Sequence, residues 1–436
     1  MQRDPDPRID PSPDAEARLA SDMREVVRRS VEAVLPEAAV REALAREAFA
    51  QGLQKARRVT LLSVGKAAWR MAKAALEALA GREVQGLVVT KYGHAMGDLP
   101  GLELIESAHP VPDANSLRAG ARALELADAA DEGDAVLLLL SGGGSALMED
   151  LPAGVTLAQL AELTRALLAC GADIRQINAV RKHLSNVKGG RLALRCAPAR
   201  VYCVALSDVL GDAPDAIASG PAAPDASTSA EALQVLAESG YAADDAMRAA
   251  LSRETPKALP GVELAVTGSV RLLAQAAAQA CRDLGYAPLV LTASMDCEAR
   301  EAGALLAAMA RDAASGASSL RPPCALILGG ETVVHLRGHG RGGRNQELAA
   351  AAGLALDGVP GVCVCSLGSD GTDGPTDAAG GIVTGAWAAR CRAAGLDPRA
   401  HLDDNDTYPL LAQTDALLVT GPTGTNVNDV AVALIR

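Results

Sequence analysis

Aromatic residues are scarce in this sequence of 436 residues, which contains one Phe, five Tyr and two Trp. Proteins that bind single-stranded nucleic acid stack the bases on aromatic side chains, so this composition argues against that class. An excess of positive charge is lacking too, because 53 acidic residues outnumber 41 basic ones and the formal net charge is −12. A nucleic-acid partner is therefore not expected, and the 49% of hydrophobic residues predicts a globular protein with aliphatic cores.

The sequence also lacks cysteines and histidines at the spacing of metal ligands, and it lacks long apolar runs. The nine cysteines and six histidines follow no zinc-ligand spacing, and we expect the cysteines to be reduced and buried. No apolar run approaches the ~18 residues of a membrane span, and the first residues have no apolar core like that of a signal peptide. We therefore expect a cytoplasmic protein. Residues 1–14 are rich in Asp and Pro, which predicts a mobile tail.

Apolar residues recur with two different periods along the chain. From 15 to 50 they follow a helical spacing that predicts two antiparallel helices. Beyond that point strand-like runs alternate with amphipathic helices. Runs such as AVLLLL at 135–140 are apolar throughout, which is typical of parallel strands buried on both faces. The pattern predicts α/β layers, and the length predicts two or three domains of about 150 residues each.

A turn-rich stretch, ETPKALPG at 254–261, is the expected boundary between two layered α/β domains with mostly parallel sheets. We assign 15–250 to the first domain and 255–436 to the second. Strands of the second domain are expected at CALILGG and VCVCSL, at TVVHL (332–336), and finally at ALLVT near Leu417.

The glycine-rich loop SGGGS directly follows the apolar run at 135–140. Its backbone N–H groups should therefore emerge at the carboxyl end of a parallel strand, where open α/β sheets bind ligands. Consecutive glycines let the backbone approach an anion closely, whereas one glycine suffices for a plain turn, which is the alternative. We predict that the loop binds a triphosphate or a carboxylate through Ser141, Gly142, Gly143, Gly144 and Ser145.

Cationic side chains occur at comparable places. Lys66 follows the strand-like run VTLLSV and should project from the same edge of the sheet as the loop, as a phosphate partner. Arg341 and Arg344 lie beside glycines at the expected start of a helix, where a guanidinium group suits oxyanion recognition. The alternative for all three is a solvated surface cation.

Two groups of carboxylates also follow strand-like runs. Asp208 and Asp212 come after RVYCVAL, and Asp370, Asp373 and Asp377 come after VCVCSL. Mg²⁺ is usually held by one or two carboxylates together with substrate phosphates, so either group is a candidate metal ligand or base. The alternative is that these residues form Asx turns.

We assign no chemical role to two further motifs. A G-x-G-x-x-G match at Gly338, Gly340 and Gly343 lacks the acidic residue at the end of the following strand that a dinucleotide site requires. The stretch SAHPVPDANS, which includes His109, is explained by turn structure and by capping of the next helix, with Asn115 as the expected cap. A Walker-type phosphate loop is absent from the sequence.

Taken together, these stretches resemble the glycerate 2-kinases that have a C-terminal MOFRL-type domain. The resemblance is carried by SVGKAAWRMA, VVTKYGH, ESAHPVPDANS, LLLSGGGSALM, INAVRKHLSNVKGGRLA, SDVLGDAPDAIASGP, LGGETVVHLRGHGRGGRNQELA and SLGSDGTDGPTDAAGG, from about residue 59 to 429. It implies a Rossmann-like N-terminal domain, a MOFRL-type region at about 322–430 within the second domain, and an active site in a cleft between the domains.

The family reaction transfers a phosphoryl group from ATP to D-glycerate and gives 2-phosphoglycerate and ADP, with Mg²⁺ or another divalent cation. The resemblance places the functional lysine and arginine on Lys66 and Arg344. We assign the remaining family positions as follows: Asp208 to catalysis, Asp370 and Asp373 to the metal, and Glu331 and Gly343 to the nucleotide, together with the SGGGS loop. Which aspartate is the base and which binds the metal is left open.

Proteins like this have often been labelled hydroxypyruvate reductases, so an NAD(P)H-dependent reductase is the first alternative. A non-catalytic sensor of sugar acids or nucleotides is the second. A homodimer is compatible with the sequence, which leaves the oligomeric state open. Replacing Lys66 or Arg344 by Ala is expected to lower kcat about a hundredfold, as does loss of an oxyanion donor, and to leave the melting temperature within a few degrees.

Overall fold

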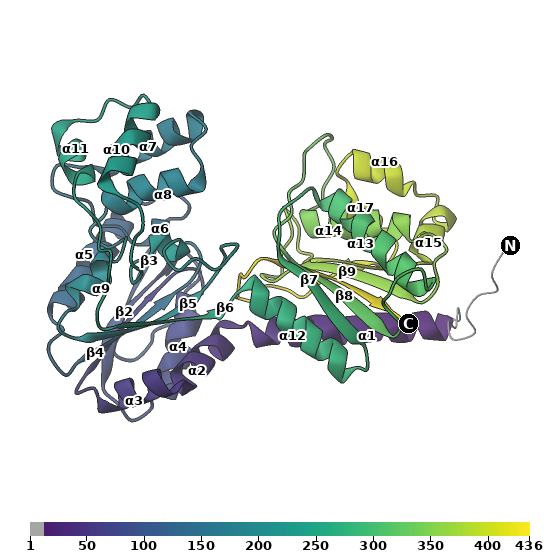
Figure 1. Cartoon of the computed structure of the whole chain (residues 1–436), viewed down its shortest axis with the longest axis horizontal. Coiled ribbons are helices and arrows are strands. Elements are labelled where there is room, and N and C mark those ends of the chain that lie inside the picture. Colours follow the sequence, from purple (N-terminus) through teal and green to yellow (C-terminus); the bar gives the residue numbers. More distant parts are fainter. Residues whose placement is uncertain (1–12) are drawn as a thin grey trace. The chain divides into compact units, whose positions relative to one another are not determined.

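The computed structural model describes residues 13–436, and the chain divides into two compact units (Figure 1). One unit is continuous in sequence and spans residues 36–267; we call it the middle unit. The other combines the residues up to 35 with residues 268–436. We call it the terminal unit because its two segments flank the middle unit in the sequence. Each unit has its own sheet.

Parallel pairing organises the sheet of the middle unit. Its strands are β1 (Val59–Val64), β2 (Val84–Lys91), β3 (Leu102–Ser107), β4 (Ala135–Leu140), β5 (Arg200–Leu206) and β6 (Val262–Gly268), in the order β3-β2-β1-β4-β5-β6. The pairs from β3 to β5 are parallel, and Val64 pairs with both Val89 and Leu140. The ends of β1, β2 and β4 therefore lie side by side. This order is that of a Rossmann fold, as expected for the first domain.

The continuous apolar sequence of β4 follows from burial on both faces. Its odd-numbered residues pack with helices α2 (Pro36–Ala45), α3 (Glu47–Lys55) and α4 (Ala68–Ala78). Its even-numbered residues pack with α5 (Ala114–Asp128), α6 (Gly144–Leu147) and α9 (Arg191–Arg195). Because successive side chains of a strand point to opposite faces, covering both faces requires apolar residues at every position.

A small helical cluster completes the middle unit. It consists of α7 (Leu157–Ala169), α8 (Ile174–His183), α10 (Ser229–Glu238) and α11 (Asp245–Leu251), which share their own hydrophobic core. The short 3₁₀ helix η1 (Ile217–Ser219) lies in the long connection after β5. Figure 1 shows this cluster as a group of helices at one end of the unit's sheet.

The terminal unit has a mixed sheet, so the expectation of mostly parallel sheets is wrong for this half. Its strands are β7 (Ala287–Met295), β8 (Cys324–Gly330), β9 (Val362–Gly368), β10 (Gly380–Thr384), β11 (Leu417–Leu418) and β12 (Asp429–Ile435), in the order β11-β10-β9-β12-β8-β7. Only β7 and β8 pair in parallel among the described strands of this sheet. The sequence analysis missed β12, which inserts antiparallel between β8 and β9. Burial on both faces makes a strand apolar whichever way it runs.

Helices cover both faces of this sheet. The side chains of Ala431, Ala433 and Ile435 pack in the core formed with α13 (Ala299–Ala314), α14 (Arg344–Ala355), α15 (Trp387–Ala393), α16 (Pro398–Asp403) and α17 (Thr407–Gln413). The alternate residues of β12 pack with α1 (Pro13–Ala33) and α12 (Val270–Asp283) (Figure 1).

The units divide at other places than the sequence analysis expected. α1 buries Met23 and Val26 against α12 and the sheet of the terminal unit, so it neither pairs with α2 nor belongs to the first domain. β6 extends the sheet of the middle unit, which moves the boundary from 250–255 to 267–268. The periodicity of apolar residues identifies an amphipathic helix or a strand. It does not indicate which sheet the helix packs on or which sheet the strand joins.

Several smaller expectations are also corrected. In TVVHL only Val333 forms an isolated bridge, and ALLVT yields the two-residue β11. Asp113, not Asn115, caps α5, because its carboxylate accepts a hydrogen bond from the N–H of Ser116. Residues 13 and 14 of the predicted tail begin α1, and the rest of that tail lies outside the described residues.

All nine cysteines lie among the described residues as free thiols, and seven of them are buried as expected, with Cys170 and Cys297 exposed. Within residues 13–436, no helix combines the length and apolar character needed to cross a membrane.

Candidate active site

The SGGGS loop, residues 141–145, directly follows β4 at the carboxyl edge of the sheet in the middle unit, and its last two residues begin α6. It is tied to the segment after β1, because the N–H of Lys66 donates to the Gly142 carbonyl at 2.9 Å. The next N–H along the chain donates to the Ser141 hydroxyl at 3.1 Å. Gly143 has a φ of +87°, a conformation that favours glycine. The N–H groups of Gly142 and Gly143 donate no hydrogen bond within residues 13–436, which leaves two backbone donors for an external acceptor.

Each glycine of this loop lies against a different neighbour. A Cβ atom placed on Gly142 would come within 2.2 Å of Oδ2 of Asp208. On Gly143 it would lie 3.0 Å from Cδ2 of His109 and 3.3 Å from Cγ of Lys66. The structure therefore places Lys66 at the loop, as the sequence analysis expected, and it adds Asp208 and also His109, which the sequence analysis assigned to turn structure.

Four basic residues, Lys66, Lys91, His94 and His109, form what we call the basic cluster. They come from the ends of β1 and β2 and from the segment after β3. Burial, followed by the charges of Lys66, Lys91 and His94, lowers the pKa of His109. Within the described part of the chain, the ammonium groups of Lys66 and Lys91 make no hydrogen bond or ion pair. The cluster thus brings together two ammonium groups that have no ion-pair partner among the described residues.

Anchors behind the loop hold it in place. The Ser145 hydroxyl lies 2.8 Å from the Ser219 hydroxyl of η1. Beyond α6, the fully buried ammonium of Lys188 bonds the Glu149 carboxylate, which also accepts from the Ser185 hydroxyl at 2.5 Å. Burial lowers the pKa of Lys188. Lys188 occurs in a stretch that carries the resemblance, but sequence reasoning gave it no role; its contacts position the far end of α6.

Arg344 lies in the terminal unit, at the start of α14, and is already engaged. Its Nε and Nη2 donate to the two oxygens of Asp429 at 2.6 and 3.0 Å, and its Nη1 donates to Glu331 at 2.8 Å. Asp429 is buried, and desolvation raises its pKa to about 6 despite the guanidinium. Two N–H groups of Arg344 remain for a ligand, since a guanidinium has five. Asp429 was not among the predicted residues, because the strand that it begins was missed.

Asp373 differs from the metal ligand that the sequence analysis expected. It is buried, and its Oδ1 accepts from the N–H and the side-chain amide of Asn345 at 3.1 and 3.3 Å. Its Oδ2 accepts from the same two groups of Gln346 at 2.9 and 3.0 Å. A carboxylate placed in this way caps the N-terminus of α14. A Cβ on Gly343 would lie 2.3 Å from the Asp373 carboxyl carbon, so this glycine makes room for the cap.

Asp370 fits a cation better than Asp373 does. Its Oδ1 accepts from the N–H of Thr372 at 2.9 Å, while its Oδ2 accepts no hydrogen bond among the described residues. The same residues contain no preformed group of three or more His, Cys, Asp or Glu that could hold a metal. Mg²⁺ needs only one or two carboxylates when substrate phosphates supply the other ligands, so the residues present fit it.

The glycines of the G-x-G-x-x-G match do not line a strand-to-helix phosphate turn. A Cβ on Gly338 or Gly340 would collide with Asp404 or Asp406, so both glycines allow two loops to pack closely. Nearby, the exposed Arg341 stacks its guanidinium 4.4 Å from the centre of the Tyr408 ring. Arg341 therefore matches the alternative of a surface cation.

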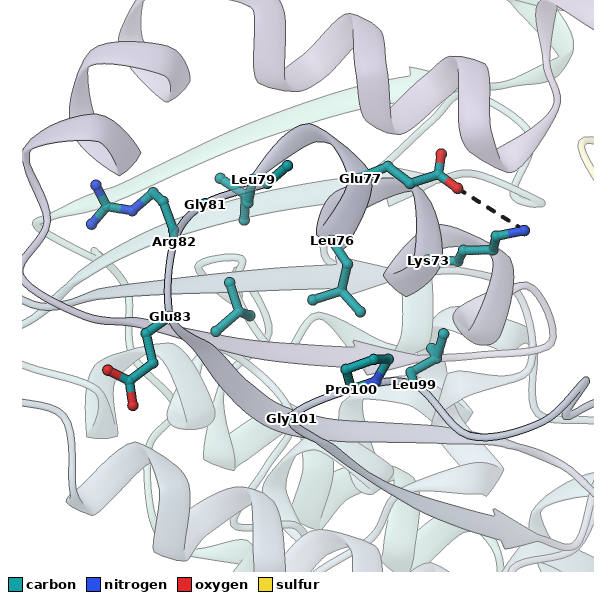
Figure 2. Close-up of a pocket in the computed structure, with 12 residues that line it drawn as sticks. Lys73, Leu76, Glu77, Leu79, Gly81, Arg82, Glu83, Leu99, Pro100 and Gly101 are labelled. Atoms are coloured by element: carbon teal, nitrogen blue, oxygen red, sulfur yellow. Dashed lines mark ion pairs between the residues drawn. The ribbon is translucent and has the colours of Figure 1, made fainter.

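A hollow of about 620 Å³ lies elsewhere in the middle unit (Figure 2). It is bordered by the last turn of α4 and by Val84 and Gly101, at the amino-terminal ends of β2 and β3. Its charged lining includes Lys73 and Glu77, which pair with each other at 4.0 Å. No predicted site residue lines it.

Comparisons with known proteins agree with these features. The model of the domain of unknown function DUF4147 matches residues 22–252, and that of the MOFRL family matches residues 324–429. A D-glycerate 2-kinase of Thermotoga maritima is 51% identical over 94% of this chain and 97% of its own length. The crystal structure of glycerate kinase from that organism superimposes with a TM-score of 0.92 at 50% identity, covering 96% of this chain and all of the other.

The chain belongs to the glycerate 2-kinase family. A 40% identical relative from Agrobacterium vitis, which covers 87% of each chain, bears the name putative hydroxypyruvate reductase. The boundaries of the two family models differ from those of the two structural units. The DUF4147 match begins within α1, which belongs to the terminal unit, and continues through most of the middle unit.

We predict that Arg344→Ala destabilises this glycerate 2-kinase family member, in contrast to the expectation from sequence. The change leaves the buried Asp429 carboxylate without its counter-charge, which costs about 3 kcal/mol, the lower end for a buried pair because Arg344 is 34% exposed. The loss in free energy of unfolding should shrink as pH falls from 8 to 5, since protonation of Asp429 removes its buried negative charge. Chemical denaturation at several pH values measures it. Arg341→Ala is the matched control, and an equal effect of both changes at every pH would contradict the prediction.

Proposed function

We propose that this protein transfers the γ-phosphoryl group of ATP to the C2 hydroxyl of D-glycerate and releases 2-phosphoglycerate and ADP. The observation that carries the proposal is the set of unpaired donors in the middle unit: the N–H groups of Gly142 and Gly143 and the ammonium groups of Lys66 and Lys91. Free donors of this kind suit a polyanion such as a triphosphate. The 51% identity to a D-glycerate 2-kinase supports the same reaction.

Lys66 holds the transferring phosphoryl group in this proposal. Phosphoryl transfer proceeds through a charged, metaphosphate-like transition state, so its catalysis consists mainly of positioning and electrostatic stabilisation. An ammonium group without a partner in the protein can neutralise that charge without first breaking an ion pair. Arg344 of the terminal unit keeps two N–H groups that can bind an anionic ligand, and Asp429 and Glu331 fix the orientation of its guanidinium.

We propose Asp370 in the terminal unit and Asp208 in the middle unit as the candidate carboxylate ligands for Mg²⁺. Asp373 is left out because N–H groups occupy both of its oxygens. When bound, Mg²⁺ would supply positive charge that offsets the negative charge of the phosphates. The SGGGS loop binds the triphosphate, since two free N–H groups and two serines offer more donors than one carboxylate needs. We place the reaction in the cytoplasm, where ATP is available and thiols such as the nine found here stay reduced.

An assay with purified protein tests the reaction. We expect D-glycerate, ATP and Mg²⁺ to yield 2-phosphoglycerate, detected by ³¹P NMR, and excess chelator to abolish the product. A parallel sample with hydroxypyruvate and NAD(P)H, followed by loss of nicotinamide absorbance, should show no comparable turnover. Faster reduction of hydroxypyruvate, or full phosphorylation in the presence of chelator, would refute the proposal.

Lys66→Ala should lower kcat by about a hundredfold or more, as does loss of a donor that stabilises transition-state charge. Its melting temperature should stay within a few degrees of the wild type, because the ammonium makes no hydrogen bond or ion pair in the described structure. Lys73→Ala, on the exposed side of α4, is the matched control and should keep the wild-type kcat. Near-normal kcat in Lys66→Ala would identify Lys66 as a solvated surface residue.

Gly143→Ala should reduce the affinity for a non-hydrolysable ATP analogue at least tenfold in calorimetry, while glycerate affinity is kept. The added Cβ meets both His109 and Lys66, and a positive φ disfavours alanine. Gly133→Ala is a matched control for backbone strain, since Gly133 has a φ of +82° and open space around its Cβ position. The reverse pattern, with glycerate binding lost and nucleotide binding kept, would assign the loop to the carboxylate.

A further inference from the structure

The proposed function gives no role to His109, which is also the member of the basic cluster that lies against Gly143 together with Lys66. It lies two residues beyond the end of β3, and its side chain makes no hydrogen bond or ion pair with any other described residue. The chain segment that carries it is nevertheless anchored. The Ser107 hydroxyl donates to the Leu147 carbonyl at 2.8 Å, which fastens the end of β3 to α6 and so brings the His109 segment to the SGGGS loop.

The ring of His109 and the chain of Lys66 flank the same glycine. From a Cβ position on Gly143, Nε2 of His109 is 3.2 Å away and Cγ of Lys66 is 3.3 Å away. A phosphoryl group held by Lys66 and by the N–H of Gly143 would therefore be within reach of the imidazole. The hydroxyl group that attacks this phosphorus must lie there too.

We propose that His109 is a further catalytic residue, whose imidazole accepts the proton of the attacking hydroxyl group. This inference rests on the proposed phosphoryl transfer. In that step the C2 hydroxyl oxygen forms a bond to the γ-phosphorus, and the bond from this phosphorus to the β,γ-bridging oxygen breaks. The bond's electron pair leaves with ADP, the hydroxyl proton passes to a ring nitrogen of His109, and the imidazolium returns it to solvent.

The surroundings of His109 keep its imidazole neutral and able to accept a proton. Burial and the charges of Lys66, Lys91 and His94 lower its pKa below the ordinary value of 6.5. At neutral pH the ring therefore carries a free lone pair. Three acidic groups border this region: Asp208 lies against Gly142, Glu106 accepts hydrogen bonds from the N–H groups of Gly93 and Ala95 beside His94, and Asp113 accepts one from the N–H of Ala108 beside His109. The neighbouring cations also make the imidazolium short-lived, because they favour release of its proton.

Histidine fits this role better than the aspartates considered for it. A carboxylate among phosphates and Mg²⁺ gains most by binding the cation, as proposed for Asp370 and Asp208. A neutral imidazole adds no negative charge beside the incoming triphosphate. General-base catalysis by such a group contributes about 10²- to 10⁴-fold, and a base with a pKa near the working pH is the most effective.

The pH dependence of kcat in His109→Gln tests the inference. The wild-type kcat should fall as pH is lowered through the pKa of His109, because only the neutral ring accepts a proton. Glutamine has the volume of histidine but does not titrate. For His109→Gln we expect a kcat about a hundredfold below that of the wild type and a KM for D-glycerate within about threefold of it. The fall of kcat at low pH, which we call the acid limb, should be absent. His401→Gln, in which a histidine of α16 is replaced, is the control and should keep the wild-type profile.

His109→Ala provides a second, independent readout. The truncation opens space beside Gly143, and added imidazole should restore kcat in proportion to its unprotonated form. Thermal melts of both variants verify the fold, which the side chain does not stabilise through any hydrogen bond in the described structure. Rescue together with loss of the acid limb supports the inference.

The outcomes separate this inference from the proposed function. A wild-type protein that phosphorylates no D-glycerate overturns the proposed function itself. An active wild type whose His109→Gln variant retains the acid limb overturns only the role of His109, whether its kcat is normal or reduced, because a reduced kcat with an unchanged limb indicates a positioning residue.

Discussion

The hydrogen bond from the N–H of Lys66 to the carbonyl of Gly142 is the contact on which the site in the middle unit depends. It continues the parallel pairing of β1 and β4 beyond the ends of both strands. The strand order reverses between these two strands, and open α/β sheets bind ligands at such a reversal. Without this bond, the lysine that follows β1 and the glycines that follow β4 would still occupy one edge of the sheet, but they would not face a common point.

Much of this arrangement could be predicted from the residues. A run that is apolar at every position predicted β4, and three consecutive glycines after it predicted an anion loop. His109 was missed because its surroundings in the sequence have a sufficient local explanation, since Asp113 does cap the next helix. That the His109 segment meets the loop after β4 is a property of the tertiary fold. The sequence analysis missed β12 and the packing of α1 on α12 for the same reason. The periodicity of apolar residues indicates burial, but it indicates neither the direction of a strand nor which elements pack against it.

Carboxylates of the same loop have different roles, and local burial decides between them. Asp373 and Asp370 are three residues apart after β9. Asp373 turns inward to the first N–H groups of α14 and is saturated by them, whereas Asp370 accepts one hydrogen bond in a turn and retains an oxygen. Arg344 is similar, because its two bonds to the buried Asp429 give it a structural role besides any catalytic one. A sequence motif specifies the residue types but not how many of their hydrogen bonds the protein itself uses.

The membership of α1 in the terminal unit has a consequence for the order in which the chain folds during synthesis. The ribosome makes α1 before the middle unit, but the residues that cover its apolar stripe lie beyond position 268, in α12 and in the strands up to β12. Residues 36–267 contain all the strands of their own sheet up to β6 and can fold as soon as they emerge. The nascent α1 must meanwhile keep Met23 and Val26 uncovered. Although α1 is translated before the middle unit, it is thus among the last elements of the described chain to reach its final contacts.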